Sequence, residues 1–330
     1  MKLGVTIPVE EGLTLPQLTA LARAAEDGGY HTVLAGEVAG PDVFALLAAV
    51  SGSLTRARLG TGIVPMTTRS LPLLAMGFAS LASLAPGRVL AGLGIGSRTV
   101  VEDWHGGELP PAVAFTREFV PAFRRLLAGG RVDVDGEHVR VRGFRLGLPP
   151  AEPVPVMLAA MNPRMLRLAG ELADAVQLTW CPPDEVPALV AAVREGARAA
   201  GRDPAEVEVV ASFFGYGGPR PDDARERYRR YVLAYSQQPT HRAAFTRSLP
   251  RLDEIDALWA EGDRTAALAL VDDPALEQLV ALGADAVANR ARLLNEAGVD
   301  VPVLLPAGAS PGDYEGALAT VVGLAERATW

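Results

Sequence analysis

Cysteine is almost absent from this chain of 330 residues, which contains only Cys181. A single thiol excludes an intrachain disulfide framework and a cysteine-rich metal site, and it is typical of a reducing compartment. No apolar run is long enough to span a bilayer, and the N-terminus passes directly into a predicted strand rather than into a signal segment. We therefore expect a cytoplasmic protein with no membrane partner and no metal ion.

Clusters of basic residues are missing as well. The formal net charge is −8, and the arginines are dispersed along the chain rather than interleaved with aromatic residues. This pattern argues against nucleic acid and against an acidic membrane surface as partners. A small molecule is the partner that we expect.

The hydrophobic content is high enough to fill a large core. Hydrophobic residues make up 49% of the chain, which suits one domain of barrel size spanning residues 1–330. Buried-strand patterns alternate with helical patterns along it. The predicted strands are 3–7, 31–35, 58–64, 89–95, 155–160, 174–180, 206–214 and 301–305. Eight such units predict an α/β fold, the (β/α)8 TIM barrel.

Two segments lie outside this alternation and are predicted to be insertions. Residues 131–142 alternate around Asp135-Gly136, as in a β-hairpin. Residues 215–282 have a mostly helical pattern and are far longer than a normal connection. This second insertion carries the aromatic residues Tyr228, Tyr231, Tyr235, His241, Phe245 and Trp259. Insertions of this kind often cover a substrate or form a subunit contact.

Glycine is concentrated at the ends of the third and fourth predicted strands. The third strand has the sequence RLGTGIV, and the fourth ends with Gly92, Gly94 and Gly96. Because the carboxyl ends of barrel strands form the active face, both ends would open onto one cavity with room for a flat ligand. The alternative, which is more common for any single glycine, is that the missing side chain only permits tight packing.

Four side chains near this face are candidates for the site. Glu37 follows the second strand, and His105 lies beside Trp104 in the polar loop after the fourth strand. A carboxylate and an imidazole in these places are candidate proton-transfer groups. Trp104 and Trp180, which ends the sixth strand, are candidates for the pocket wall. The alternatives are a Glu37 that caps or solvates its loop and a His105 with structural hydrogen bonds only.

The fifth strand runs into a predicted helix start. Asn162 is a typical N-cap, and Pro163 suits the first helical turn. The unpaired N–H groups of such a start, with the charge of Arg164, favour an anionic group. An ordinary capped helix is the alternative.

Five segments together resemble a known family. They are AAEDGGYHTVLAGE, TRARLGTGIVPMTTRSLPLLA, GRVLAGLGIGS, EDWHGG and PVMLAAMNPRMLRLAGELADAVQL, at residues 24–37, 55–75, 87–97, 102–107 and 155–178. On these motifs the chain is similar, from Met1 to about Ala211, to the luciferase-like oxidoreductases, in the branch that uses the deazaflavin coenzyme F-420. Each segment is weak alone, and the combination is specific.

The resemblance implies a redox enzyme with F-420 as its cofactor, or FMN as the alternative. It implies a cis peptide at Gly62-Ile63 behind the cofactor ring and a polar contact from Ser97. It also places the phosphate and oligoglutamate tail of the cofactor near Ala159, Ala160, Met161 and Asn162. Family members are often dimers, so a homodimer is possible.

The chain departs from well-studied relatives at two places. They carry Asp-His where this chain has Gly36-Glu37, and some sugar-phosphate dehydrogenases carry an acidic residue where it has Ser97. The pattern resembles instead a group of actinobacterial deazaflavin oxidoreductases. We predict hydride transfer between F-420 and a small imine, enone, alcohol or aldehyde, with Glu37 and His105 handling the proton. The alternatives are an FMN-dependent monooxygenase and a non-catalytic cofactor-binding barrel.

Overall fold

Eight parallel strand positions close into a barrel in the computed structural model, which describes residues 1–328. The ring order is β10-β12-β1-β2-β3-β5-β8-β9, and β9 pairs with β10 to close it. The strands are β1 (Gly4–Ile7), β2 (Thr32–Ala35), β3 (Arg58–Thr61), β5 (Val89–Gly94), β8 (Val156–Ala159), β9 (Ala175–Thr179), β10 (Glu208–Tyr216) and β12 (Val301–Leu305). The predicted (β/α)8 barrel is confirmed.

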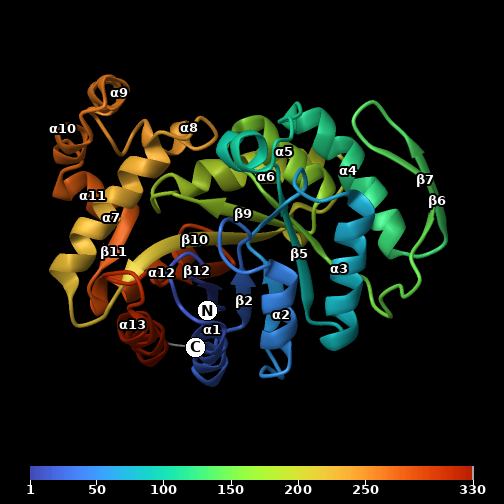
Figure 1. Ribbon diagram of the computed structural model, residues 1–330, viewed down its shortest axis with the longest axis horizontal. Helices are drawn as coiled ribbons and strands as arrows, with labels where there is room; N and C mark the ends of the chain where they lie inside the picture. Colours follow the sequence, from blue (N-terminus) through green and yellow to red (C-terminus); the bar gives the residue numbers. More distant parts are fainter. Residues whose placement is uncertain (329–330) are drawn as a thin grey trace.

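Helices surround the barrel (Figure 1). They are α1 (Leu15–Asp27), α2 (Val43–Ser51), α3 (Leu71–Leu84), α4 (Ala112–Leu127), α5 (Pro163–Leu172), α6 (Val186–Ala199), α12 (Ala284–Glu296) and α13 (Tyr314–Arg327). Their starts follow local rules: Thr14 and Gln17 form a capping box on α1, and Ser70 caps α3. Among residues 1–328, no helix has the length and apolarity to cross a membrane.

Two additions extend from the barrel at opposite sides (Figure 1). The strands β6 (Arg131–Asp135) and β7 (Arg140–Arg145) form the antiparallel hairpin that the sequence predicts. The helical segment contains α7 (Pro221–Ser236), α8 (Arg242–Phe245), α9 (Leu252–Glu261), α10 (Arg264–Ala269) and α11 (Asp273–Leu279). It ends in β11 (Val280–Leu282), which pairs with the last residues of β10. The strand β11 was not predicted, because three residues give no periodic pattern.

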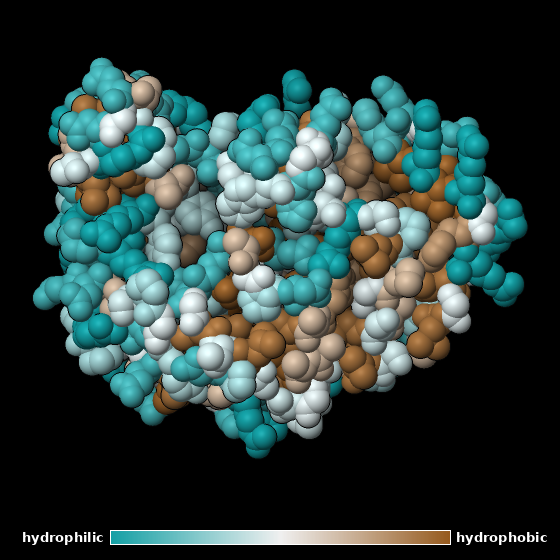
Figure 2. Space-filling view, viewed as in Figure 1, coloured by the Kyte–Doolittle hydropathy of each residue, from teal (hydrophilic) through white to brown (hydrophobic). Residues whose placement is uncertain are grey.

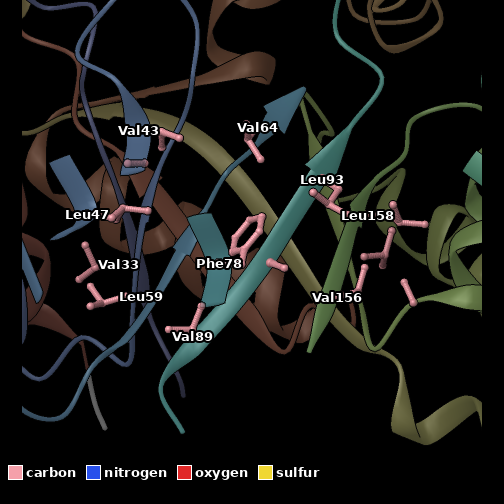
Figure 3. Packing of buried hydrophobic residues seen from close by; sticks show 14 of the residues in the cluster. Val33, Val43, Leu47, Leu59, Val64, Phe78, Val89, Leu93, Val156 and Leu158 are labelled. Carbon is pink, nitrogen blue, oxygen red and sulfur yellow. The ribbon is translucent and has the colours of Figure 1, made fainter. Parts of the chain in front are cut away.

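The strands separate two apolar cores because alternate side chains point to opposite faces. The outer core joins the barrel to the helices, and Figure 3 shows Val33, Leu59 and Val89 of the strands with Leu47 of α2 and Phe78 of α3. The inner core fills the barrel. It contains Leu34, Leu90, Met157, Ala175, Val210, Val301 and Val303, each at most 2% exposed. The lower part of the barrel is therefore solid.

The third strand is not continuous, which corrects the predicted strand 58–64. The strand β3 stops at Thr61, and β4 (Val64–Pro65) resumes the pairing with β5. Gly60 pairs with Leu90 and Val64 with Leu93, so three residues of one strand oppose two of the other. The extra residue makes a β-bulge, and the cis peptide expected at Gly62-Ile63 lies in it.

Candidate active site

The carboxyl end of the barrel is open. Ala159, Thr179 and Leu305, the last residues of β8, β9 and β12, are half-buried, while nearly every residue before them in these strands is fully buried. Figure 2 shows the surface indented between the lobe of α9 and α10 and the helices α5 and α6. We call this opening the barrel mouth. It is where the sequence analysis expected the site.

The bulge lies at the barrel mouth, and neighbouring strands hold it. Gly62 and Ile63 are half-buried. The Gly62 N–H donates to the carbonyl of Ala35 (2.8 Å), and the Ile63 carbonyl accepts from the N–H of Glu37 (2.9 Å). The bulge therefore has a fixed place beside the segment that follows β2.

The glycines of β5 accommodate the bulge and do not form a bare patch. A Cβ on Gly92 would lie 1.8 Å from the carbonyl oxygen of Thr61, and one on Gly94 would lie 2.7 Å from Cδ1 of Ile63. This corrects the expectation of a cleared surface at the end of the fourth strand and matches the packing alternative. Gly36 differs, because the nearest atom to its Cβ position is 3.6 Å away.

Glu37 is bound by an arginine that the sequence analysis did not single out. Arg69 donates from Nε to Oε1 (2.9 Å) and from Nη2 to Oε2 (2.5 Å), and it also contacts Asp42, the N-cap of α2. The hydrogen bond to Glu37 is the main cause of the raised pKa of Arg69. Both carboxylate oxygens of Glu37 are engaged, so its position is fixed.

The predicted loop after β5 is a π-helix, η1 (Thr99–Trp104), which corrects the prediction. The Oγ of Ser97 accepts from the N–H of Val100 (3.3 Å) at its start. His105 ends it, and both His105 and Trp104 are exposed. No hydrogen bond or ion pair within residues 1–328 joins His105 to Glu37.

The predicted helix start after β8 is confirmed. Asn162 caps α5 by accepting from the N–H of Met165 (3.0 Å). Ala159 and Met161 are half-buried at the barrel mouth, whereas Ala160 is buried and donates its N–H to the backbone carbonyl of Gln177. Within the described chain, Arg164 makes no ion pair or side-chain hydrogen bond. Its charge is therefore available at a helix N-terminus.

Trp180 belongs to an aromatic cluster built by the helical segment. It is 3% exposed and stacks on Phe214, with ring centroids 4.4 Å apart. Tyr235 and Phe245 contact it at 5.0 and 5.2 Å. The cluster fixes α7 and α8 beside the barrel mouth, and the role of Trp180 as a pocket wall stays a prediction.

A buried carboxylate that the sequence analysis missed joins α7 to the barrel. Glu11, which follows β1, accepts from Nη2 of Arg227 (3.0 Å), the hydroxyl of Tyr231 (2.5 Å) and the N–H of Gly308 (2.9 Å). It is 4% exposed. Its place after a strand was the available signal, as for Glu37, but its partners are more than 200 residues away.

A histidine near this junction has a shifted pKa. Burial lowers the pKa of His241 to about 4, and its ring lies 5.3 Å from that of Tyr235. His241 is therefore a neutral imidazole at neutral pH.

Comparison with known proteins identifies the family. The family model described as luciferase-like monooxygenase matches residues 1–301. The chain belongs to this family. Among luciferase-like proteins it is 32% identical over 191 residues to the 5,10-methylenetetrahydromethanopterin reductase of Methanolobus tindarius, covering 58% of each chain. It is 34% identical over 196 residues to a putative coenzyme F-420-dependent oxidoreductase of Mycobacterium tuberculosis, covering 55% of each.

The likeness in fold extends over nearly the whole chain. The coenzyme F-420-dependent tetrahydromethanopterin reductase of Methanopyrus kandleri superposes with a TM-score of 0.81 at 23% identity, over 98% of each chain. At that identity the match concerns the fold. In sequence, the chain spans only a little over half the length of the two curated relatives named above.

Proposed function

We propose that this luciferase-like protein is an F-420-dependent oxidoreductase that transfers a hydride to or from a small organic molecule. The observation that carries the proposal is the open barrel mouth. The Gly62-Ile63 bulge lies on one side of it, and Arg164, which makes no ion pair within the described chain, lies on another side at the start of α5. A planar ring against the bulge and an acidic tail at α5 suit these two features. The relatives named for F-420 support this choice of cofactor.

The residues present fit such a group. Gly62 and Ile63 would line the ring, and Ser97 would offer a polar contact. The tail would lie near Ala159, Ala160, Met161 and Asn162, with the charge of Arg164 beside it. When bound, the deazaflavin supplies or accepts the hydride at a ring carbon. The protein excludes water with the solid inner core below and the aromatic cluster of Trp180 at the side.

A hydride transfer also needs a proton to be moved at the substrate. Glu37 is held beside the bulge by Arg69, and His105 lies on the exposed end of η1. Glu37 is the better positioned of the two, and in this proposal it orients the substrate or exchanges a proton with it. His105 approaches the substrate from the edge of the barrel mouth. The substrate is an imine, enone, alcohol or aldehyde.

Titration of the purified protein with F-420 and with FMN tests the cofactor. We expect an absorbance change and saturable binding with F-420 and weak or no binding with FMN. Tight FMN binding with oxygen consumption and no F-420 binding would instead indicate the monooxygenase. F-420 binding without turnover of any imine, enone, alcohol or aldehyde would favour the non-catalytic barrel.

Substitution of the proton-handling candidates should separate turnover from cofactor binding. Glu37→Gln and His105→Asn are each expected to lower kcat tenfold or more while the Kd for F-420 changes little, because proton transfer typically contributes at least that much. Glu171→Gln is the control, since Arg117 binds Glu171 through both oxygens on the outside of the barrel. An unchanged kcat for either variant rejects that residue.

We also propose that α2 and α3 form a homodimer interface. Neither helix contains a charged residue, and Leu73, Met76 and Leu84 on α3 are 47–56% exposed. Figure 2 shows this hydrophobic surface over α2 and α3. An uncharged apolar face is typical of an interface with another subunit.

Met76→Lys is expected to convert a dimer into a monomer, because the new charge would be buried without a partner. Sedimentation velocity at micromolar concentration measures the change. Leu15→Lys is the matched control, since Leu15 is as exposed as Leu73 but lies on α1. A wild type that sediments as a monomer would reject the interface.

A further inference from the structure

The interior of the barrel changes from apolar to polar just below the barrel mouth. Thr6, Gln177 and Ser212 are 5–6% exposed. Their sequence neighbours pack in the outer core, so these three side chains point into the barrel. The residues two positions before Gln177 and Ser212, Ala175 and Val210, belong to the inner core. We call Thr6, Gln177 and Ser212 the polar layer, and it lies between the inner core and the barrel mouth.

The polar layer extends across the barrel to the bulge. The Nε2 of Gln177 donates to the Oγ of Ser212 (2.9 Å). The same nitrogen lies 3.4 Å from the position that a Cβ on Gly62 would take. Thr6 on β1 and Ser212 on β10 are separated in the ring only by β12, and alternate strands contribute to one level of a barrel. Gln177 on the adjacent β9 pairs in register with Val210, so it lies between that level and the inner core. The amide of Gln177 therefore lies between Ser212 and the bulge.

Two atoms of the polar layer have no hydrogen-bond partner within the described chain. They are Oε1 of Gln177 and Oγ1 of Thr6, and both are buried. If the amide of Gln177 is turned over, Ser212 pairs with the oxygen and the nitrogen becomes the unpaired atom. One end of the amide is unpaired in either orientation. Because a buried unpaired polar atom is unfavourable and uncommon, this pair needs an explanation.

We propose that Gln177 and Thr6 bind one N–H or O–H group of a molecule that enters the barrel mouth. The oxygen of Gln177 would accept the hydrogen, and the hydroxyl of Thr6 would donate to a neighbouring oxygen of the same molecule. Because the unpaired atoms of Gln177 and Thr6 are buried, binding requires the Gln177 side chain to turn towards the opening. The inner core directly below is apolar and offers no polar contact, so the site takes one polar edge.

Two kinds of molecule carry this chemistry. One is the ring of the cofactor, whose pyrimidinedione edge has an N–H beside two carbonyl oxygens in deazaflavin and in flavin; this source rests on the proposed function. The other is the hydroxyl of a substrate alcohol. The experiment separates the two.

The variants Thr6→Val and Gln177→Met remove the unpaired atoms with little change in volume. Thr116→Val is the matched control, because Thr116 on α4 is 0% exposed and its Oγ1 is also unpaired. We expect no loss of melting temperature for either valine variant, since neither hydroxyl has a partner to lose. Thr6→Val keeps the test valid if Gln177→Met folds poorly.

Affinity is then measured without turnover. If the ring is the source, the Kd for F-420 rises about tenfold in Thr6→Val and Gln177→Met and is unchanged in Thr116→Val. If the site binds the substrate hydroxyl instead, the Kd for F-420 is unchanged in Thr6→Val and Gln177→Met. The cofactor-free variants then lose the preference of the wild type for cyclohexanol over cyclohexyl methyl ether. A wild type that binds FMN and not F-420 rejects the proposed cofactor, and the same variants are then measured with FMN. Unchanged affinities in both arms, or a wild type that binds neither ring nor cyclohexanol, overturn the site.

Discussion

Gly196→Ala is expected to lower the free energy of unfolding by about 3 kcal/mol. A Cβ on Gly196 of α6 would lie 1.9 Å from the carbonyl oxygen of Arg167, and one on Gly170 of α5 would lie 2.0 Å from the carbonyl oxygen of Val193. Each helix thus presents a glycine to the backbone of the other. Because backbone cannot rotate away as a side chain can, the helices would have to separate. Urea denaturation measures the loss.

Helix propensity alone predicts that a glycine-to-alanine change in a helix raises the free energy of unfolding. A second helical glycine is therefore the control. Gly323 lies within α13, and the nearest atom to its Cβ position is the end of the flexible Arg327 side chain at 3.6 Å. Gly323→Ala should therefore stabilise by roughly 0.5–1 kcal/mol, the usual advantage of alanine in a helix. Stabilisation by Gly196→Ala as well would contradict the close approach of α5 and α6. The contact matters for function because α5 carries the proposed tail site at its start.

Glu26→Gln is expected to cost about 2 kcal/mol of stability at neutral pH, allowing for screening near the surface. The carboxylate of Glu26, 5% exposed at the end of α1, accepts from the N–H groups of Thr55 (3.0 Å), Arg56 (2.7 Å) and Ala57 (2.8 Å). These residues lead directly into β3. In Glu26→Gln, an amide NH2 group replaces one carboxylate oxygen and cannot accept hydrogen bonds. Some of the three backbone N–H groups are therefore left unpaired.

The same contacts predict how stability depends on pH. Burial alone would raise the pKa of Glu26, but the hydrogen bonds from the backbone of Ala57, Thr55 and Arg56 outweigh it and lower the pKa to about 2. The contribution is therefore complete above the ordinary pKa of 4.5 and is lost as the pH falls from there towards 2. Thermal melts across this range should show a weaker pH dependence in Glu26→Gln than in the wild type.

A second glutamate provides the control for this prediction. Glu118 also accepts from three consecutive backbone N–H groups, those of Glu137, His138 and Val139 in the hairpin. It lies at the surface, where water replaces lost hydrogen bonds, so Glu118→Gln should have a smaller effect. Equal losses for the two variants would show that burial of Glu26 is not the cause.

Local pattern predicted the fold because each unit of the barrel is local. Strand and helix periods, the Asn162 cap and the turn at Asp135-Gly136 depend on residues within a few positions of one another. The break in the third strand could not be predicted from its residues, since RLGTGIV is a good strand pattern. Resemblance to relatives, rather than periodicity, indicated the cis peptide there.

Strand and helix patterns alone predicted the barrel, its open face, and the strand ends at which Glu37, Asn162 and Gly62 lie. The folded barrel sets which side chains meet: Arg69 with Glu37, Glu11 with the residues of α7, and Gln177 with Ser212 below the bulge. It also decided that Ile63 and Thr61 fill the space beside the β5 glycines. The physical reason is that alternation along a strand fixes which face a side chain occupies, whereas its partner depends on how the closed ring brings distant strands together.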